Sequence, residues 1–280
     1  LMSISWYPGH MHKARKELAA AMKDSQLLIE VLDARIPHAS SNPLFTALRA
    51  NRPCLRILNK ADLADPDVTA SWQRYFRLQP ASDCLINGLD QGLKTTEIIR
   101  IANRLTAAAG LVKSPRQALI AGIPNVGKST LLNQIAERKL AKTGNEPAMT
   151  RQQQRIRLAD DWYLIDTPGL LWPRLEDQTG AYRLAMTGSI RNTAIDAEDI
   201  AWFAAETLLK DAYPALAQRY TLPNRPDGPR HLLEMIGRQR GCLGKHGAVD
   251  LHKAAELLLN DYRSGKIGRL SLESPPVVAK

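Results

Sequence analysis

The sequence predicts an α/β fold in which a mostly parallel six-stranded sheet is followed by a small all-helical domain. Short apolar runs alternate with helix-forming segments up to residue 166, which is typical of parallel strands joined by helical crossovers. After residue 169 only helical segments follow. We therefore expect two domains, residues 1–175 and residues 176–280.

The individual elements follow from apolar runs, helix formers and turn residues. The segment 35–43 is rich in Pro, Ser and Asn, and we expect a loop there. Asp160 and Asp161 suit a tight hairpin, which would supply one antiparallel strand at the sheet edge. Strands are expected at residues 26–32, 53–58, 82–86, 117–121, 153–159 and 161–166. Helices are expected at residues 11–23, 66–78, 92–108, 128–136, 181–187, 196–211, 214–220, 230–239 and 248–262.

The composition is that of a globular protein without membrane spans. Hydrophobic residues make up 44% of the 280 residues, which is enough for a substantial core. No apolar run approaches the ~20 residues of a membrane helix, and the first residues carry no apolar signal segment. Three widely spaced cysteines (Cys54, Cys84 and Cys242) do not suggest a disulfide framework. We expect a cytoplasmic protein with reduced thiols and no membrane partner.

The chain is basic, with a net charge of +10 and an isoelectric point of about 9.6. Residues 1–175 hold 24 Lys and Arg against 15 Asp and Glu, whereas residues 176–280 hold 14 against 13. Such an excess favours a polyanionic partner through summed attraction to phosphates, although a merely basic soluble enzyme would have the same charge. Charge alone does not choose between them.

Residues 122–129, GIPNVGKS, fit a phosphate loop between a strand and a helix. Gly122 and Gly127 allow the sharp bends, because glycine tolerates the backbone angles that they need. The helix that begins near Lys128 would point its N–H groups and positive dipole end at phosphate oxygens. The Lys128 ammonium would reach the β- and γ-phosphates, and the Ser129 hydroxyl would bind Mg²⁺.

Residues 166–169, DTPG, fit the DxxG switch that follows a phosphate loop. Asp166 ends an apolar strand, as suits a carboxylate held beside Mg²⁺ through water. The Gly169 N–H would bind the γ-phosphate and move on hydrolysis. A second magnesium ligand is expected in the polar loop ahead of the edge strand. Thr150 is our first choice there, and Thr143 is the alternative.

Residues 59–62, NKAD, fit the NKxD signature of guanine recognition. The Asp62 carboxylate can accept from both N1–H and N2–H₂ of guanine, and adenine offers no such pair of donors. Asn59 would hold N7 and O6, and the Lys60 stem would lie along the base. A wrong base would leave the Asp62 carboxylate buried and unpaired. Residues 87–88 follow the next strand, where the last base-contacting loop belongs.

The order of these motifs is unusual. A Ras-like GTPase places the phosphate loop first, DxxG second and NKxD last, whereas here NKxD comes first. We therefore expect a circularly permuted Ras-like P-loop GTPase domain, with the switch leading directly into the helical domain. The residues expected at the nucleotide are Asn59, Lys60, Asp62, Asn87, Gly88, Asn125, Val126, Gly127, Lys128, Ser129, Thr130 and Gly169.

With these motifs the chain resembles the circularly permuted YlqF/RbgA GTPases, the ribosome biogenesis GTPase A family, over nearly its whole length. Further marks are WYPGHM at residues 6–11, Lys13-Ala14, DARIP at residues 33–37, Asn42-Pro43, RGC at residues 240–242 and GKIGRL at residues 265–270. The resemblance implies a GTPase that acts in assembly of the large ribosomal subunit and has mitochondrial relatives. It also implies a helical domain that helps to bind ribosomal RNA.

The catalytic group is the open question of the sequence. Many GTPases carry a glutamine directly after DxxG, but Leu170 stands there, and an apolar side chain cannot orient water. His10 is our first candidate, because its pKa would let it relay a proton near neutrality, with packing or RNA binding as its alternative roles. Asn125 resembles the asparagine with which some related GTPases hold K⁺. Lys128 and Thr150 complete the expected catalytic set.

The C-terminal half adds basic residues and one Cys/His group. Cys242, His246 and His252 lack the second thiol pair of a zinc site, so we expect no zinc there. Basic residues could contact RNA phosphates or simply form a solvated surface. They are Arg238, Arg240, Lys245, Lys253, Arg263, Lys266 and Arg269.

These features predict a monomeric GTP hydrolase with Mg²⁺, and with K⁺ as a second candidate ion. We expect it to bind ribosomal RNA or a precursor of the large subunit in the GTP state, and to leave after slow hydrolysis that the particle stimulates. Two alternatives remain at this point. One is a GTP-dependent binding module with incidental hydrolysis, and the other is a GTPase in RNA modification or signalling.

Overall fold

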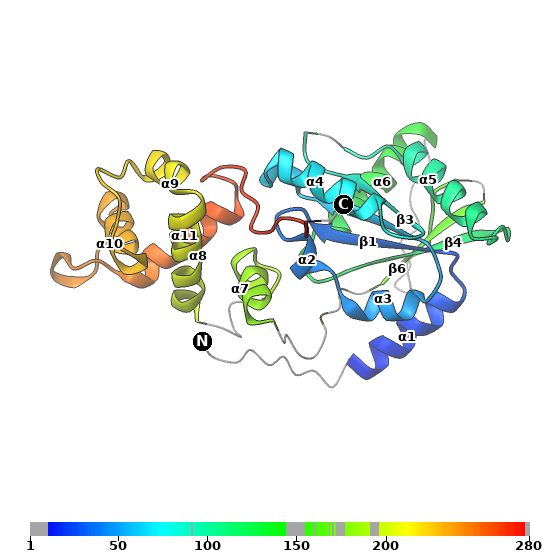
Figure 1. Ribbon diagram of the computed structural model, residues 1–280, viewed down its shortest axis with the longest axis horizontal. Coiled ribbons are helices and arrows are strands. Elements are labelled where there is room, and N and C mark those ends of the chain that lie inside the picture. The colour runs from blue at the N-terminus through cyan, green and yellow to red at the C-terminus, as the bar shows by residue number, and fades with distance from the viewer. Residues whose placement is uncertain are drawn as a thin grey trace. The chain divides into compact units, whose positions relative to one another are not determined.

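The computed structural model describes residues 11–90, 92–143, 155–159, 161–167, 169, 171, 177–190 and 196–277 (Figure 1). Contacts between Cα atoms divide the chain into two compact units. One comprises residues 7–173 and 273–280, and the other comprises residues 1–6 and 174–272. The expected ranges, 1–175 and 176–280, differ from this division mainly at residues 1–6, which group with the second unit, and at residues 273–280, which group with the first.

The first unit is built on a six-stranded sheet in the order β3-β2-β1-β4-β6-β5. Its strands are β1 (Leu27–Asp33), β2 (Cys54–Asn59), β3 (Ser82–Ile86), β4 (Arg116–Gly122), β5 (Arg155–Arg157) and β6 (Trp162–Asp166). Neighbouring strands are parallel except β5, which pairs antiparallel with β6 at the edge. The expected sheet, with its antiparallel edge hairpin, is therefore confirmed.

The register of the sheet brings the ends of distant sequence segments together. Asp33 pairs with Asn59, Val31 pairs with Gly122, and Ile120 pairs with Asp166. The carboxyl ends of β1, β2, β4 and β6 therefore lie along one edge, where ligands of open α/β sheets bind. This edge carries the starts of the NKAD, phosphate-loop and DTPG segments.

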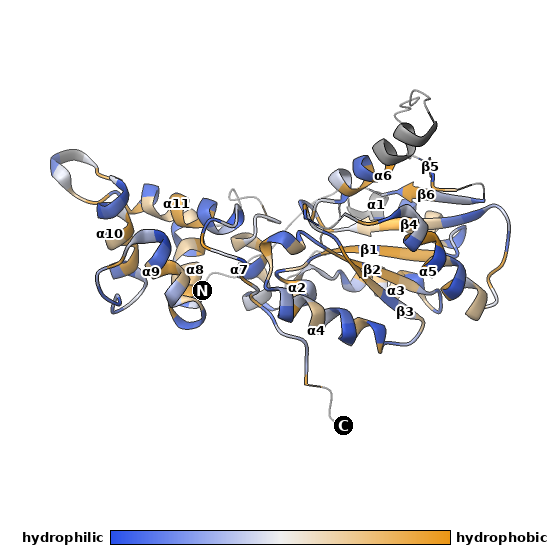
Figure 2. Cartoon of the chain, turned by 90° about the horizontal axis from the view of Figure 1, so that it is seen from above, coloured by the Kyte–Doolittle hydropathy of each residue, from blue (hydrophilic) through white to orange (hydrophobic). Residues whose placement is uncertain are grey.

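Helices pack around the sheet because both of its faces are apolar. All seven residues of β1 and all six of β2 are buried, and Figure 2 shows these strands as hydrophobic ribbons. The helices of this unit are α1 (Met11–Lys23), α2 (Pro37–Ser40), α3 (Pro43–Arg49), α4 (Pro66–Arg77), α5 (Thr95–Ala108) and α6 (Lys128–Thr143). Helices α1 and α3 pack with Leu28, Cys54 and Leu119, and α4 packs with Leu32 and Leu58.

The segment 35–43 is not the simple loop that its composition predicts. It contains α2, and α3 starts at its last residue. Proline is favoured in the first turn of a helix, where its missing N–H costs nothing, and Pro37 and Pro43 both stand there. The Asn42 side chain caps α3 by accepting from the Leu44 N–H at 2.9 Å. The loop expectation was wrong because these residues start helices as well as ending them.

The second unit is helical in the part that the structure describes. It contains α7 (Gln178–Met186), α8 (Ala197–Asp211), α9 (Tyr213–Tyr220), α10 (Pro229–Arg240) and α11 (Leu251–Arg263). Its core is formed by apolar residues of all five of these helices, and Asp261 of α11 is a buried carboxylate beside them. Across the described residues, no helix combines the length and apolarity needed to cross a membrane.

The chain after the second unit returns to the first. The carboxylate of Glu273 accepts from the main-chain N–H of His38 at 2.8 Å and of Ala39 at 3.2 Å. The indole N–H of Trp72 donates to the Glu273 carbonyl at 3.1 Å. Glu273 thereby joins α2 to α4.

Candidate nucleotide-binding site

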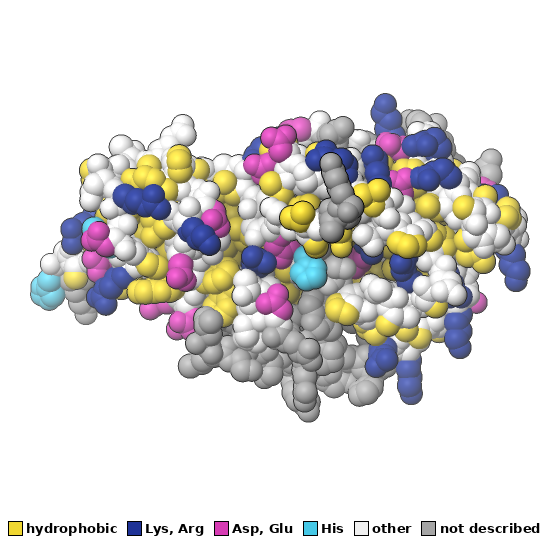
Figure 3. Space-filling view, viewed as in Figure 1, with side chains coloured by type: hydrophobic (Ala, Val, Ile, Leu, Met, Phe, Trp, Pro, Cys, Tyr) yellow, Lys and Arg dark blue, Asp and Glu magenta, His cyan; other side chains and the backbone are white. Residues whose placement is uncertain are grey.

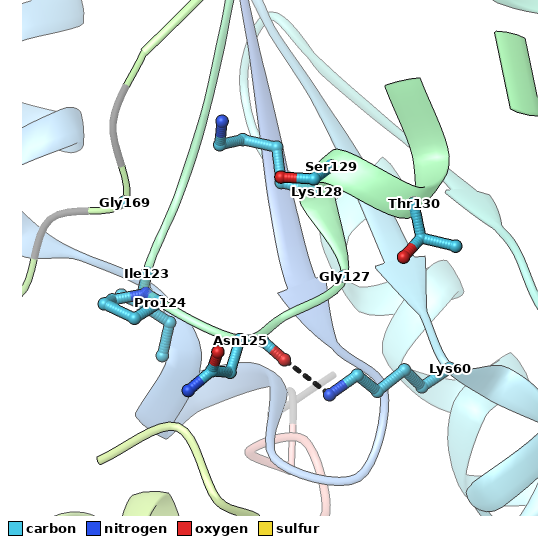
Figure 4. Close-up of a pocket in the computed structure, with 9 residues that line it drawn as sticks. All are labelled: Lys60, Ile123, Pro124, Asn125, Gly127, Lys128, Ser129, Thr130 and Gly169. Atoms are coloured by element: carbon cyan, nitrogen blue, oxygen red, sulfur yellow. Dashed lines mark hydrogen bonds between the residues drawn. The ribbon is translucent and has the colours of Figure 1, made fainter. Parts of the chain in front are cut away.

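A cavity of about 500 Å³ lies over the phosphate loop (Figure 4). It is lined by Lys60, Ile123, Pro124, Asn125, Gly127, Lys128, Ser129, Thr130 and Gly169. Seven of these are residues that the motifs predicted at the nucleotide, and Ile123 and Pro124 are additions. The other five predicted residues, Asn59, Asp62, Asn87, Gly88 and Val126, lie in the bonded framework beside it.

The phosphate loop has the tight backbone that its sequence predicts. It joins β4 to α6, with Asn125 at a φ of 61° and Gly127 at 89°. A Cβ on Gly127 would lie 2.4 Å from the Asn59 amide nitrogen, so only glycine fits there. The loop therefore presents the N-terminus of a long helix to the cavity, an arrangement that suits an anionic phosphate group.

The switch segment lies directly against the phosphate loop. A Cβ on Gly169 would come within 3.2 Å of the Pro124 backbone, so the two segments are in close approach. The Lys128 ammonium contacts the Asp166 carboxylate, and the Lys128 side chain is almost buried. The cation expected at the phosphates, at the start of α6, and the carboxylate expected at the metal, at the end of β6, therefore lie side by side.

Ser129, which lines this cavity, and Asp166, which contacts the cavity residue Lys128, fit a magnesium ion. Mg²⁺ prefers oxygen ligands and combines few protein ligands with substrate phosphates. The Ser129 hydroxyl and the Asp166 carboxylate supply such oxygens, and Ser129 is exposed toward the cavity (Figure 4). The Asn125 amide, expected for K⁺, is also exposed at the cavity rim. Thr150, His10 and Leu170 lie outside the described residues.

The base-reading segment is hydrogen-bonded to the phosphate loop. The Asn59 amide donates to the Val126 carbonyl at 2.8 Å, and the Asn87 amide donates to Asn59 Oδ1 at 2.7 Å. Asn87 Oδ1 in turn accepts from the Leu93 N–H at 3.1 Å. These bonds join the ends of β2 and β3 to the loop after β4.

Asp62 faces the loop that follows β3. Its Oδ1 accepts from the Leu89 N–H at 3.1 Å, and a Cβ on Gly88 would lie only 2.9 Å from the Asp62 N–H nitrogen. The glycine therefore allows the two loops to approach closely. Asp62 is half-buried, so its carboxylate can meet the edge of a purine that enters from the cavity.

Lys60 spans the site and has a partner that sequence reasoning missed. Its ammonium donates to the Asn125 carbonyl at 2.5 Å (Figure 4). It also lies 3.6 Å from Asp33 Oδ2. Asp33 is fully buried and is bound through both oxygens by Arg35. In the sequence, Asp33 directly follows one predicted strand, and Asn59 and Lys60 directly follow the next. If those two strands are neighbours in the sheet, their ends lie together, and this could have suggested the contact.

Charges at this position shift two pKa values. Burial alone would raise the pKa of Asp33, but the Arg35 charge, its hydrogen bonds and Lys60 together hold that pKa below its usual value. Burial lowers the pKa of Lys60, and the attraction of Asp33 only partly opposes this. Asp33 is therefore an ionised buried carboxylate whose charge is balanced by its two basic neighbours.

Full-length relatives decide the family. The ribosome biogenesis GTPase A of Bacillus pumilus is 41% identical over 281 residues, which cover 98% of this chain and 99% of the relative. The chain belongs to the ribosome biogenesis GTPase A family. The mitochondrial ribosome-associated GTPase 1 of Mus musculus is 31% identical over 96% of this chain and 89% of the relative.

A solved structure and a family model are also similar to this member of the ribosome biogenesis GTPase A family. The crystal structure of GNP-bound YlqF from T. maritima matches with a TM-score of 0.67 and 24% identity, over 95% of this chain and 100% of that one. The model described as 50S ribosome-binding GTPase matches residues 117–212. That match begins in β4 and leaves residues 59–62 outside, as a permuted motif order predicts.

Proposed function

We propose that this chain is a GTP-hydrolysing assembly factor for the large ribosomal subunit. It binds ribosomal RNA or a pre-ribosomal particle in the GTP state and leaves after hydrolysis. The proposal depends most on one observation, the pair of bonds from Asn59 and Lys60 to the carbonyls of Val126 and Asn125. Through them the guanine-reading segment and the phosphate loop form one site despite their reversed order in the chain.

The residues of this site have different proposed roles, in binding the base, the phosphates and the metal ion. Asp62 reads the guanine edge, and Asn59, Asn87 and Gly88 hold the base-reading loops in place. Lys128 and the N–H groups of the phosphate loop bind the phosphates, and preorganised charge of this kind is the main source of catalysis in phosphoryl transfer. Bound Mg²⁺ would neutralise charge on the phosphate oxygens, and Ser129 and Asp166 would hold it.

The catalytic water needs a polar group that Leu170 does not supply. His10 is the proposed base, and Thr150 is the proposed second magnesium ligand. Asn125 is the proposed ligand of K⁺, whose charge would act where other GTPases use an arginine. The potassium role predicts faster GTP hydrolysis in K⁺ than in Na⁺ at equal ionic strength, and equal rates would exclude it.

Basic surface supports the RNA part of the proposal. Figure 3 shows many Lys and Arg side chains over the first unit, in keeping with the 24 basic and 15 acidic residues among residues 1–175. On the second unit Arg238 and Arg240 at the end of α10 and Lys253 on α11 are exposed. We propose that residues 1–175 act as the nucleotide domain and residues 176–280 as the RNA-binding domain of a cytoplasmic monomer.

Sedimentation through sucrose gradients tests this function. The chain is mixed with large subunits, or with their precursors, in the presence of GDP or of a non-hydrolysable GTP analogue. We expect co-sedimentation with the analogue and much less with GDP, because the γ-phosphate orders the switch that Gly169 belongs to. Co-sedimentation that ignores the nucleotide would contradict the switch, and its absence in both states would contradict the ribosomal role.

A further inference from the structure

Asp33 stands where the first two strands of the fold end side by side. It pairs with Asn59 across β1 and β2, which places it next to the residue that follows, Lys60. Its two carboxylate oxygens accept from Arg35, Oδ1 from Nε at 2.9 Å and Oδ2 from Nη2 at 2.7 Å. Oδ2 also faces the Lys60 ammonium at 3.6 Å. A buried carboxylate thus lies under the lysine of the guanine-reading motif.

The loop that carries Asp33 is fixed by its own hydrogen bonds. The Asp33 N–H donates to Ser40 Oγ at 3.0 Å, and that hydroxyl donates to the Ile36 carbonyl at 2.7 Å. The Ala34 N–H donates to the Asn59 carbonyl at 2.8 Å, which ties the loop to the end of β2. The Asp33 carboxylate is therefore held in one place before any ligand binds.

Lys60 needs such a partner because its stem is long and flexible. Its backbone is left-handed, with a φ of 58°. A Cβ on Gly127 would come within 3.7 Å of Lys60 Cε, so the stem passes along the phosphate loop. A four-carbon stem has many rotamers, and contacts at its ammonium select among them. Here these contacts are the Asn125 carbonyl and Asp33 Oδ2.

We propose that Asp33 and Arg35 are positioning residues for the guanine nucleotide. Asp33 holds the Lys60 ammonium against the phosphate loop, so that the lysine stem is already laid out as one wall for the purine. Arg35 fixes the Asp33 carboxylate in the orientation that faces Lys60. This inference rests on the proposed function, since it needs a guanine nucleotide at this site.

A purely structural role for the pair makes a different prediction. If Asp33 only stabilised the fold, its substitution would weaken nucleotide binding regardless of what stands at position 60. If it acts through Lys60, its effect disappears once the ammonium is gone. A double-mutant cycle separates the two, because it isolates the energy of one interaction.

The dissociation rate of fluorescently labelled GDP is measured by stopped flow for the unmodified chain, Asp33→Asn, Lys60→Met and the double variant. Methionine keeps a flexible apolar stem without the charge. We expect Asp33→Asn to speed release about tenfold, the effect of losing a charged interaction. In the Lys60→Met background the same change should alter the rate less than twofold.

Asp83→Asn is the matched control. Asp83 is another buried carboxylate of the same sheet with two arginine partners, Arg77 and Arg104, but it lies near the start of β3, away from the cavity. Its substitution should lower stability and leave GDP release unchanged. If Asp33→Asn does not fold, Arg35→Lys perturbs the same carboxylate and is compared in both backgrounds.

The outcomes separate this inference from the function on which it rests. An unmodified chain that binds no guanine nucleotide would overturn the proposed function. A chain that binds GDP, but releases it at the same rate after Asp33→Asn, would overturn only the positioning role. Equal acceleration with and without the Lys60 ammonium would do the same, because the effect would then be structural.

Discussion

The Asn59 side chain donates to the Val126 carbonyl at 2.8 Å, and so joins two motifs that are far apart and reversed in the chain. In a parallel sheet the ends of neighbouring strands meet at one edge, whatever the order in which the chain visits them. Circular permutation therefore changes the order of the motifs in the chain, while the sheet still brings their strand ends to the same edge. The switch at Gly169 becomes the last nucleotide element before the helical unit.

We propose that Asp62 sets the choice of base, and Asp62→Asn should then change it. Asparagine offers an N–H₂ donor where the carboxylate offers only acceptors, which suits the C2 oxygen of xanthine. We expect GTP affinity to fall by at least about 100-fold and xanthosine triphosphate to become the better ligand. Competition binding measures this. Asp65→Asn, at the N-cap of α4, is the control and should keep the preference for GTP. An unchanged base preference in Asp62→Asn would contradict the proposed base-reading role of Asp62.

Gly127→Ala should abolish nucleotide binding. The added Cβ would stand 2.4 Å from the Asn59 amide nitrogen, in a backbone conformation with a φ of 89°. Gly110→Ala is the matched control, because Gly110 has a φ of 70° but no atom within 4 Å of the new Cβ. We expect it to cost about 1 kcal/mol of stability and to leave binding intact. Equal binding losses in the two variants would contradict the steric explanation.

The three cysteines should differ sharply in reactivity. Cys54 and Cys84 are buried, and burial raises the pKa of Cys54 to about 11 and that of Cys84 further. The thiolate is the reactive form, so a raised pKa leaves less of it at pH 8. We expect a disulfide reagent to modify Cys242 quickly in the native protein and the other two only after urea unfolding. Fast modification of all three thiols in the native protein would contradict the burial of Cys54 and Cys84.

Asp261 should be important for the stability of the helical unit. This buried carboxylate accepts from Arg219 Nε at 2.9 Å and from the Tyr220 hydroxyl at 3.1 Å. Asp261→Ala would leave the buried Tyr220 hydroxyl without its acceptor, and an unpaired buried polar group costs about 1–3 kcal/mol, so we expect destabilisation of that order. Glu234→Gln removes the partner of the exposed Arg230 and should cost under about 0.5 kcal/mol. Urea unfolding compares them, and similar costs would contradict this difference in burial.

Sequence patterns were sufficient to predict the strands, and most of the residues predicted at the nucleotide line one cavity or lie beside it. Uninterrupted apolar runs marked β1 and β2, and glycine spacing marked the phosphate loop. The patterns failed where side chains bond across distant elements. Nothing local shows that Glu273 caps α2 from 235 positions away, or that Asp33 meets Lys60 through strand register. Prolines and Asn42 were misread as loop because the same residues also begin helices.

Phosphate release from GTP, measured with and without large ribosomal subunits, tests the central claim most directly. The chain alone should hydrolyse GTP slowly, because Leu170 cannot orient water, and added large subunits should raise the rate. Lys128→Ala gives the background rate of phosphate release, since it removes the ammonium that we propose binds the phosphates. Fast hydrolysis by the isolated chain, unchanged by large subunits, would contradict the account of a particle-dependent GTPase.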